Sequence, residues 1–507
     1  MKHGHVKIRI LDEVSMAIVG LQDEHVKFFY DKYAVYARNY FFNPKYKLGQ
    51  WDGKIRYFYK TGKTYLYLVD DILPKIVEMG YKVHVEDLRA TNIVRPDPVK
   101  ADIFECYTHL EDGTPITLRD DQVEGVNALI ENGYGVVVAG TGAGKTLMCA
   151  ALVTAYGKHG VRSITIVPNE NLIGQTKAEY INCGLDTGEY SGTRKTLDHQ
   201  HVVSTWQALQ NNVKIVGTFD MVIVDECHGL KGEVLSKLVT VHAGKIPYRF
   251  GFTGSLPKEA SDVMSVHIAV GPQRFEMKAR KLIDKGVLAR MNIDVLQLVE
   301  DFKDEYKTFC EKEAVGKPPT YIQFKDSYFP DYSSEKSYLH HNEERILWIA
   351  HLVETKRDER KGNVMCLVDN IAFGRKLAAE IEGAIFVNGK DVKSPKQRQV
   401  VYDMFKDQND LVVIATVHIA GVGINIRRIF NLVLVDIGKS FIRVIQAIGR
   451  GLRKAKDKEH VTITDVCSDL KYGKRHCRQR MNYYEEAQYP HKKHKINYVE
   501  QMRDVEL

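Results

Sequence analysis

Cysteine is scarce in this chain of 507 residues: eight are scattered along it, with no C-x-x-C pair and no regular spacing. That scarcity excludes a disulfide framework, argues against structural zinc and favours a reducing compartment. Long apolar runs are also missing, because no stretch approaches the roughly 18 residues needed to cross a bilayer. Low-complexity tracts and short-period repeats are absent too. We therefore expect a soluble protein with no membrane partner.

The first residues lack the pattern of a secretory signal. The stretch MKHGHVKIRILDEV begins with basic side chains but reaches Asp12 and Glu13 before any long apolar region. We therefore expect the protein to stay in the cytoplasm. Charge of one sign is not strongly in excess either, since the net charge of +7 is mild for this length. Such a balance says little about partners unless the charge is concentrated on one surface.

The length predicts about three domains, because one hydrophobic core does not ordinarily hold so long a chain. From about residue 118, apolar strands alternate with helical segments, and the strand candidates are VVVAG, SITIVP, HVVSTW, MVIVDE and YRFGFTGS. A second such series is NVMCLVDN, AIFVNG, LVVIAT, NLVLVD and VTITDV. This alternation predicts two parallel sheets with a cleft between them. The expected fold class is α/β, with two tandem parallel-sheet lobes after a small amino-terminal α/β domain.

Five segments follow from these patterns. We place an amino-terminal domain at 1–100, a first, ATP-binding lobe at 101–290, a connecting segment or insertion at 291–345, a second lobe at 346–475 and a basic carboxy-terminal extension at 476–507. The connecting segment is polar, aromatic and interrupted by prolines. Near the end of the second lobe, KYGKRHCRQR at 471–480 has five basic residues and no acid. It fits a solvated helix face or a nucleic-acid contact, and the sequence does not separate the two.

The strongest chemical motif is AGTGAGKT at 139–146, between an apolar strand and a helical segment. Its glycines let backbone N–H groups approach phosphate oxygens, Lys145 supplies charge to the terminal phosphates, and Thr146 can bind magnesium. The nucleotide-binding residues expected here are Gly140, Thr141, Gly142, Ala143, Gly144, Lys145 and Thr146. The motif predicts ATP and Mg²⁺ as cofactors. The alternative is a glycine-rich turn with an incidental lysine, and the flanking strand and helix argue against it.

An acidic pair follows a later apolar strand, in VIVDECHG. Asp225, at the end of that strand, can hold magnesium through water, and Glu226 can polarise the attacking water. On its own, such a pair is more often a solvated strand end. Together with the glycine-rich loop it predicts a site of ATP hydrolysis, in which Lys145, Asp225 and Glu226 are catalytic.

The basic segment QAIGRGLRK in the second lobe completes the predicted machinery. Gln446, Arg450 and Arg453 are spaced by four and three residues, so one helix face presents them together. An arginine that reaches toward the phosphates stabilises the negative charge of the transition state. A basic face that contacts solvent or nucleic acid is the alternative. We favour the catalytic role, because a site divided between two lobes lets hydrolysis open and close a cleft.

The motifs over about 115–470 together resemble those of the superfamily-two helicases and translocases. The matching strings are TLRDDQ, AGTGAGKT, TIVPNENLIGQT, VSTWQAL, DECH, GFTGSL, CLVDN, ATVHIAGVGINI and QAIGRGLR. The resemblance implies RecA-like lobes and gives roles to further residues: adenine binding to Arg119 and Gln122, nucleotide contact to Gly423, nucleic-acid contact to Pro168, Thr205, Trp206, Asn370 and Thr416, and coupling of the two sites to His228, Thr253 and Ser255. Asn425 departs from the acidic residue of many relatives, so nothing is carried over for it.

Two further stretches narrow the resemblance. GPQRFEMKARKLIDKGVLARMNI is similar to a segment of restriction translocases and XPB-like enzymes, a branch that favours duplex DNA. YFFNPKYKLGQWDGKIRYF is similar to the amino-terminal region of phage branch-migration helicases. Its aromatic residues, interleaved with lysine and arginine, either stack on bases or build a core. We favour a core role for most of them, and assign to Trp51, in a turn between Gly49 and Gly53, a contact with DNA.

These resemblances imply an ATP-dependent DNA helicase or translocase that remodels branched DNA in recombination, repair and replication. The expected reactions are branch migration, fork regression and displacement of strands or R-loops, carried out by a monomer in a bacterial or phage-infected cell. The expected partner is branched or duplex-containing DNA, with RNA in R-loops. One alternative is an RNA helicase, since DECH and Gln122 suit both substrates. Another is a nucleic-acid binder with an ATP switch and no motor activity.

Overall fold

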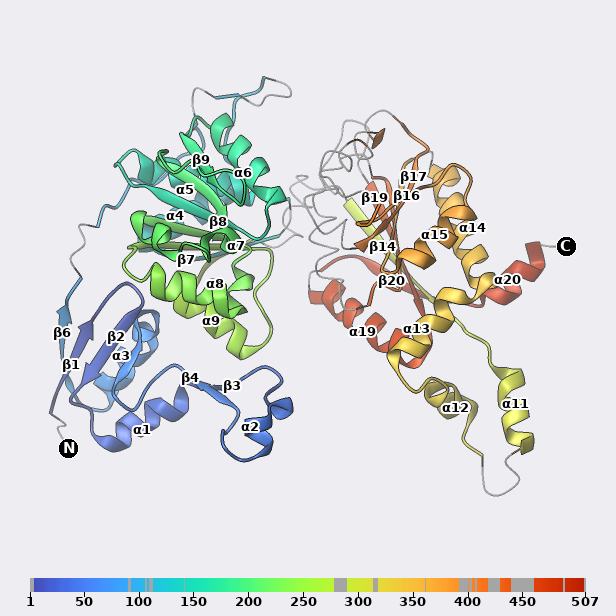
Figure 1. The fold of residues 1–507 in the computed structure, drawn as a ribbon, viewed down its shortest axis with the longest axis horizontal. Coiled ribbons are helices and arrows are strands. Elements are labelled where there is room, and N and C mark those ends of the chain that lie inside the picture. Colours follow the sequence, from blue (N-terminus) through green and yellow to red (C-terminus); the bar gives the residue numbers. More distant parts are fainter. Residues whose placement is uncertain are drawn as a thin grey trace. The chain divides into compact units, whose positions relative to one another are not determined.

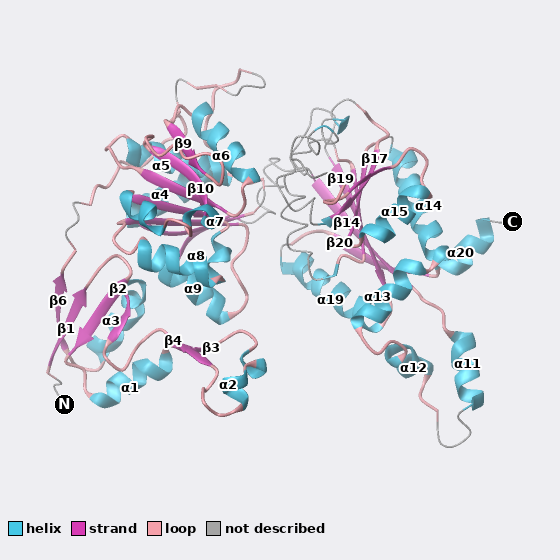
Figure 2. Cartoon of the chain, viewed as in Figure 1, coloured by secondary structure: helices cyan, strands magenta, loops and turns pink. Residues whose placement is uncertain are grey.

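The computed structural model describes residues 4–89, 93–104, 107–108, 113–140, 142–277, 290–312, 318–360, 362–391, 400, 404–405, 408–417, 429–438, 460–486 and 488–505. The chain forms two compact units, which divide after Met277 (Figure 1). The first unit holds the amino-terminal domain and one parallel sheet, and the second unit holds the other parallel sheet (Figure 2). In the described part of the chain, no helix is long and apolar enough to span a membrane.

The amino-terminal domain is a four-stranded sheet packed with helices. Its elements are β1 (His5–Ile10), β2 (Ser15–Val19), α1 (Asp23–Lys32), β5 (Lys63–Tyr65), the short helix η2 (Leu66–Leu68), α3 (Val69–Glu78) and β6 (Lys82–Asp87). The strand order is β5-β2-β1-β6, with β1 antiparallel to β2 and parallel to β6. Alternation along β1 directs Val6 and Ile8 into the core, where they join Phe29 of α1. The small α/β domain expected from the sequence is confirmed.

A protrusion, residues 34–56, extends from this domain between α1 and β5 (Figure 1). It comprises β3 (Ala34–Tyr36), the 3₁₀ turn η1 (Tyr40–Phe42), α2 (Pro44–Lys47) and β4 (Lys54–Arg56), and β3 pairs with β4. Every residue from 41 to 50 is exposed. The core role favoured for the aromatic residues of this stretch is therefore wrong for most of them, and those that are buried are Tyr57 and Phe58. Two strands of three residues present too little sheet surface to bury the others.

The first lobe is a seven-stranded sheet whose described pairings are all parallel. The strands are β7 (Tyr134–Ala139), β8 (Ser163–Val167), β9 (Thr187–Tyr190), β10 (His201–Thr205), β11 (Met221–Asp225), β12 (Tyr248–Thr253) and β13 (Gln273–Met277). The helices are α4 (Asp120–Asn132), α5 (Lys145–Gly157), α6 (Asn171–Asn182), α7 (Trp206–Leu209), η3 (Val213–Thr218), η4 (Cys227–Lys231), α8 (Glu233–Lys237), η5 (Leu238–His242) and α9 (Ala260–Val270). The order β13-β7-β12-β11-β8-β10-β9 places the carboxyl ends of β7, β12 and β11 side by side.

The amino-terminal domain packs against α9 of the first lobe. The Tyr57 hydroxyl donates to the Ser261 carbonyl oxygen across 3.3 Å, and His267 Nε2 lies 2.9 Å from the Tyr67 carbonyl oxygen. Both contacts join residues far apart in the chain and lie in a buried or half-buried position. They hold the domain and the first lobe together as one compact unit.

The second unit is built on another seven-stranded sheet, again with parallel pairing throughout its described strands. The strands are β14 (Arg290–Leu298), β15 (Val364–Val368), β16 (Ile385–Val387), β17 (Val412–Thr416), β18 (Asn431–Val435), β19 (His460–Ser468) and β20 (His491–Ile496), in the order β16-β17-β15-β18-β19-β14-β20. The five strands expected here are present, which confirms the two-lobed α/β fold. The sheet also contains β14 and β20, from the ranges that the sequence assigned to a connecting segment and a carboxy-terminal extension.

Helices surround the second sheet and extend beyond it (Figure 2). They are α11 (Lys303–Lys312), α12 (Tyr321–Ser327), α13 (Tyr332–His341), α14 (Glu343–Arg360), α15 (Ile371–Ala379), α19 (Lys471–Glu486) and α20 (Tyr498–Val505). The segment of α11 to α13 has a small hydrophobic cluster of its own, around Phe302 and Phe324. Lys325 Nζ lies 2.8 Å from Asp469 Oδ2, just after β19. This ion pair anchors the helical segment on the second sheet.

Candidate active site

The turn between β7 and α5 has the conformation that a phosphate-binding loop needs. Gly142 and Gly144 have φ values of +83° and +81°, which residues with a side chain adopt only at a cost. A Cβ atom on Gly144 would also collide with Nε2 of Gln122. Lys145 is the first residue of α5, so the amino-terminal N–H groups of that helix belong to the same turn. The turn therefore offers backbone donors and a cation to an anionic ligand.

Arg119 and Gln122 hold the glycine-rich loop in place by hydrogen bonds to its backbone. Arg119 Nη2 and Gln122 Nε2 both donate to the Ala143 carbonyl oxygen, at 2.8 and 2.9 Å. Asp121, which sequence reasoning missed, pairs with Arg119 Nε at 3.1 Å and fixes the direction of the guanidinium. The available signal was the pair of acids between the two residues, in RDDQ. Adenine binding by Arg119 and Gln122 stays a prediction, and both residues lie beside the glycine-rich loop.

The acidic pair expected after β11 lies beside the loop lysine. Lys145 Nζ is 3.2 Å from Glu226 Oε1, and Asp225 Oδ1 accepts from the Glu226 N–H at 3.0 Å. Glu226 has a φ of +50°, a left-handed conformation that is rare for a residue with a side chain. Such strain persists where the surroundings hold a residue in place, and it concentrates at functional sites. The structure thus brings the predicted lysine and acidic pair together.

The electrostatic setting of Glu226 keeps its carboxylate charged. Burial alone would raise the pKa of Glu226, but the nearby Lys145 and a hydrogen bond with His228 outweigh it, and the pKa lies well below its usual range. The distance from Glu226 Oε2 to His228 Nδ1 is 3.2 Å. An ionised carboxylate accepts hydrogen bonds and can orient a water molecule. The low pKa also makes it a weak proton acceptor while Lys145 stays beside it.

Thr253, at the end of β12, ties this site to the predicted coupling residues. Its Oγ1 lies 3.0 Å from His228 Nδ1 and 3.3 Å from Glu226 Oε2, and it is 2.9 Å from the Ser255 carbonyl oxygen. Thr253 is fully buried. Because β12 lies between β7 and β11, this network spans the strands that carry the loop and the acidic pair. Four predicted residues, Glu226, His228, Thr253 and Ser255, therefore form one connected cluster.

The substitution Thr253→Val should uncouple ATP turnover from strand displacement. Valine keeps the shape of threonine but removes the hydroxyl that joins Glu226 and His228, an interaction with a charged group worth about 1.5–3 kcal/mol. We expect the number of ATP molecules used per displaced strand to rise about tenfold, which corresponds to about 1.4 kcal/mol. Turnover and displacement are measured in the same reaction. Thr165→Val is the matched control, because Thr165 is buried in β8 and its hydroxyl contacts Tyr180 instead.

Residues predicted to contact nucleic acid from the first lobe follow β8 and β10. Pro168 comes directly after β8 and is half-buried. Thr205 caps α7, since its Oγ1 accepts from the Ala208 N–H at 3.3 Å, and only 5% of it is exposed. Trp206 packs against the hydrophobic core of the lobe. These residues share the carboxyl edge of the sheet with Asp225, and their contact with nucleic acid stays a prediction.

The other predicted nucleic-acid contacts are dispersed. Asn370 caps α15, with Oδ1 accepting from the Phe373 N–H at 3.0 Å, and Thr416 ends β17. Trp51 is half-buried in the protrusion, where its indole N–H donates to the Lys54 carbonyl oxygen at 2.9 Å. Six residues named in the sequence analysis lie outside the described residues: Thr141, Gly423, Asn425, Gln446, Arg450 and Arg453. Their roles stay predictions from the sequence.

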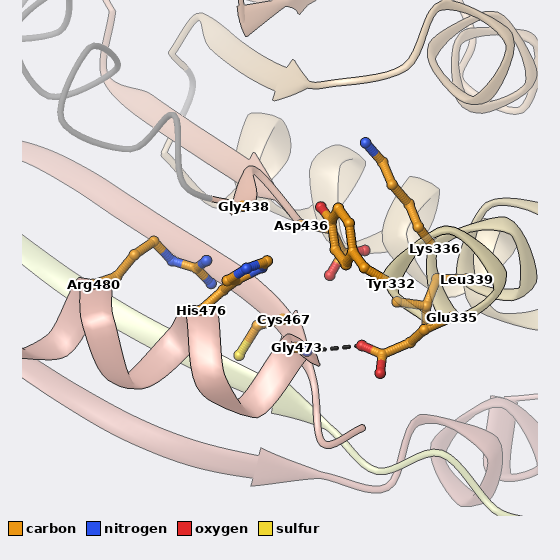
Figure 3. A pocket seen from close by; sticks show the side chains of 10 residues that line it. All are labelled: Tyr332, Glu335, Lys336, Leu339, Asp436, Gly438, Cys467, Gly473, His476 and Arg480. Carbon is orange, nitrogen blue, oxygen red and sulfur yellow. Dashed lines mark hydrogen bonds between the residues drawn. The ribbon is translucent and has the colours of Figure 1, made fainter. Parts of the chain in front are cut away.

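A pocket that sequence reasoning did not find lies in the second unit, between α13, α19 and the ends of β18 and β19 (Figure 3). Glu335 of α13 accepts from the backbone N–H groups of Tyr472 and Gly473, at 2.9 and 2.7 Å, and so caps α19. Arg480 lies on α19 and pairs with Asp465 of β19 at 2.8 Å. At this pocket, Glu335 joins α13 to α19, and Arg480 joins α19 to β19.

Three parts of the chain match known protein families. Residues 3–86 match the amino-terminal domain of the DNA helicase UvsW, residues 115–258 match the res subunit of type III restriction enzymes, and residues 344–455 match the conserved carboxy-terminal domain of helicases. The matches follow one another in the order that the motifs predicted. They cover the amino-terminal domain and most of both parallel-sheet lobes.

Individual relatives agree with these families. The ATP-dependent DNA helicase uvsW of Enterobacteria phage T4 is 24% identical over 458 residues, which are 86% of this chain and 85% of the phage protein. The DNA 3′-5′ translocase XPB2 of Sulfurisphaera tokodaii is 31% identical over 174 residues, or 34% of this chain and 38% of the translocase. A solved fragment assigned to the HsdR subunit of a type I restriction enzyme from Vibrio vulnificus shares the fold, with a TM-score of 0.54, 16% identity and coverage of 78% of this chain and 71% of the fragment. The chain therefore belongs to the superfamily-two DNA helicases, with an amino-terminal domain of the UvsW type.

Proposed function

We propose that this helicase uses ATP hydrolysis to remodel branched DNA, by branch migration, fork regression and displacement of strands or R-loops. The observation that carries the proposal is the connected cluster of Lys145, Glu226, His228 and Thr253, which joins the loop lysine, the acidic pair and the coupling residues in one site. The UvsW-type amino-terminal domain supports DNA as the substrate, because the phage T4 relative is named an ATP-dependent DNA helicase.

The Lys145–Glu226 ion pair suggests how the site responds to ATP. We propose that the glycine-rich loop holds the phosphates, while Arg119 and Gln122 contact the adenine. The phosphates carry more negative charge than one carboxylate, so Lys145 turns to them and its ion pair with Glu226 opens. Without that cation, the pKa of Glu226 rises toward its ordinary range. The carboxylate then becomes a better acceptor for the proton of the attacking water.

Magnesium is the metal that suits the oxygen donors near the loop. The Thr146 hydroxyl, in the first turn of α5, and the Asp225 carboxylate, at the end of β11, are the hard ligands that Mg²⁺ prefers. We propose that these two residues hold the ion. Held there, Mg²⁺ would supply positive charge that offsets the negative charge of the phosphates.

The remaining proposals concern the path of the nucleic acid. Contact with its sugar-phosphate backbone is proposed for residues of both lobes, namely Pro168, Thr205, Trp206, Asn370 and Thr416. Binding of this kind weakens as salt concentration rises. Gln446, Arg450 and Arg453 are proposed to complete the hydrolytic machinery on the basis of their spacing. We further propose that the protein acts as a monomer in the cytoplasm of a bacterial or phage-infected cell.

The substitution Lys145→Ala tests the proposed site. ATP turnover should fall about a hundredfold to a thousandfold, because removing one preorganised donor costs that much in rate. DNA affinity should change little, since it rests on contacts elsewhere. Turnover is measured with single-stranded DNA, duplex, four-way junction and RNA hairpin at matched salt. Lys158→Ala is the matched control, because Lys158 is exposed and caps the opposite end of α5.

The same comparison decides between substrates. Strong stimulation by the four-way junction, together with its remodelling by the purified protein, supports the proposal. Stimulation by the RNA hairpin with little response to DNA of equal sequence would favour an RNA helicase instead. Turnover at background with every nucleic acid would leave an ATP switch without motor activity.

A further inference from the structure

The protrusion carries an exposed aromatic surface that the ATPase site does not use. Phe41 and Phe42 are 49% and 66% exposed, and Tyr36 and Tyr46 are 51% and 37% exposed. Aromatic side chains bury a large apolar area when they can, so a group of them in water marks a binding surface. The hydrophobic core of the amino-terminal domain leaves them out, although it includes the neighbouring Tyr57 and Phe58.

Tyr40 holds these rings in a fixed arrangement. Its ring stacks on Tyr36 with the centroids 4.5 Å apart, meets Tyr46 edge-on at 4.8 Å and lies 5.7 Å from Phe41. A Cβ atom on Gly53 would come within 2.6 Å of the Tyr40 ring, so glycine is needed there. Rings that are already positioned lose little conformational entropy on binding. The surface is therefore preorganised for a ligand.

The protrusion is also strongly basic. Its cationic residues are Arg38, Lys45, Lys47, Lys54 and Arg56. Lys54 Nζ lies 5.0 Å from the centre of the Tyr36 ring, so charge and aromatic surface adjoin. The single acid in this stretch, Asp52, pairs with Arg56 and leaves the other cations in excess. Positive charge neutralises phosphates and aromatic faces stack on bases, so the combination suits a nucleic acid with unpaired bases.

The base of the protrusion is attached to the ATPase lobe. Tyr57 follows β4 directly, and its hydroxyl donates to the Ser261 carbonyl oxygen of α9. α9 comes shortly after Thr253 and Ser255 of the coupling cluster. The aromatic surface and the ATPase site thus belong to one compact unit.

We propose that Phe41 and Phe42 stack on unpaired bases at a DNA branch point, while the surrounding lysines bind the adjoining phosphates. The inference rests on the proposed function, because it names the element that recognises the branched substrate. Inside a duplex the flat faces of the bases are covered by neighbouring base pairs. At a branch point, where strands separate, such faces are exposed. The excess of cations favours nucleic acid over a protein partner as the occupant.

Affinity measurements on the full chain test this assignment. The double variant Phe41→Ala with Phe42→Ala is compared with Leu48→Ala, because Leu48 is 70% exposed on the same protrusion and has no aromatic face. Each protein is titrated with a four-way junction and with a linear duplex of equal length at the same salt. The ratio of the two affinities should fall about tenfold in the double variant, as expected for the loss of base stacking, and stay unchanged in Leu48→Ala.

A second variant and a fluorescent base separate stacking from other effects. Phe42→Leu keeps an apolar side chain of similar size but removes the ring, so it should also lower the ratio. A 2-aminopurine at the branch point should be quenched on binding by the wild-type protein and much less by either phenylalanine variant. Equal losses in Leu48→Ala, or an unchanged ratio in the double variant, would overturn the proposal. If linear duplex still stimulates ATP turnover by the wild-type protein, the motor function survives that result.

Discussion

Replacing Glu226 by glutamine is expected to lower ATP turnover about a thousandfold, within the range usual for loss of a general base. Glutamine keeps the shape of the side chain and can still hydrogen-bond to Thr253 and His228, but it neither accepts a proton nor carries charge. Lys145, now without its 3.2 Å carboxylate partner, is more available to phosphates. ATP should therefore bind at least as tightly as before. Steady-state turnover and the binding of a fluorescent ATP analogue measure the two effects.

The control for this variant lies seven positions further along the chain. Glu233→Gln makes the same change on α8, where the side chain is 79% exposed and pairs with Lys237 at the surface. Its turnover should match that of the wild-type protein, because exposed pairs contribute little and this one is remote from the loop. Normal turnover in Glu226→Gln would refute the role of this carboxylate. Loss of ATP binding together with turnover would show instead that Glu226 shapes the loop.

Much of this site could be predicted because each part is local in sequence. A glycine-rich turn before a helix and an acidic pair after an apolar strand are short patterns, and a parallel sheet brings such strand ends to one edge. The ion pair between Lys145 and Glu226 and the left-handed backbone of Glu226 could not be predicted. They depend on the order β7-β12-β11, which pairs strands that are distant in the chain. Asp121, which orients Arg119, is a local neighbour instead, but the sequence does not show whether it or Asp120 faces the guanidinium.

The protrusion shows where composition misleads. Aromatic residues that alternate with basic ones fit a half-buried strand as well as an exposed surface. Whether these aromatic side chains are buried or exposed depends on the length of β3 and β4, which the sequence does not predict. Trp51 donates its indole N–H to the Lys54 carbonyl oxygen, and its contact with DNA stays a prediction. Phe41 and Phe42, which we expected in a core, are exposed to water.

The sequence does not separate two roles for the basic segment 471–480, and in the structure this segment begins α19. His476, Cys477 and Arg480 are buried on one side of this helix, while Lys471 and Arg475 are exposed. Hydrophobic periodicity could not reveal that division, because the buried side is made largely of polar residues. A clue lay in VTITDV, where an acid interrupts an apolar strand and so calls for a buried partner.

Arg480→Ala is expected to weaken the second unit by about 3–5 kcal/mol, as is usual when one partner of a buried ion pair is removed. The Arg480 side chain is 2% exposed, and that of Asp465 is fully buried. Arg480 Nε donates to Asp465 Oδ2 at 2.8 Å, and the Tyr484 hydroxyl donates to the same oxygen at 3.0 Å. Burial alone would lower the pKa of Arg480, but Asp465 raises it above its usual value. Without the guanidinium, the Asp465 carboxylate stays buried with no counter-charge.

Amide hydrogen exchange of β19 in the full chain measures this loss, and exchange should speed up about a hundredfold to a few thousandfold. Arg478→Ala removes an exposed cation from the same helix and should leave exchange unchanged, because surface substitutions usually matter by less than about 0.5 kcal/mol. Arg480→Met combined with Asp465→Leu removes both charges and should recover most of the loss. If Arg480→Ala exchanged like the wild-type protein, the ion pair would not stabilise the fold.

Arg480 is buried in its ion pair with Asp465, so any nucleic-acid contact by α19 must come from the exposed face of the helix. Arg478→Ala, and not Arg480→Ala, should therefore alter the salt dependence of DNA binding.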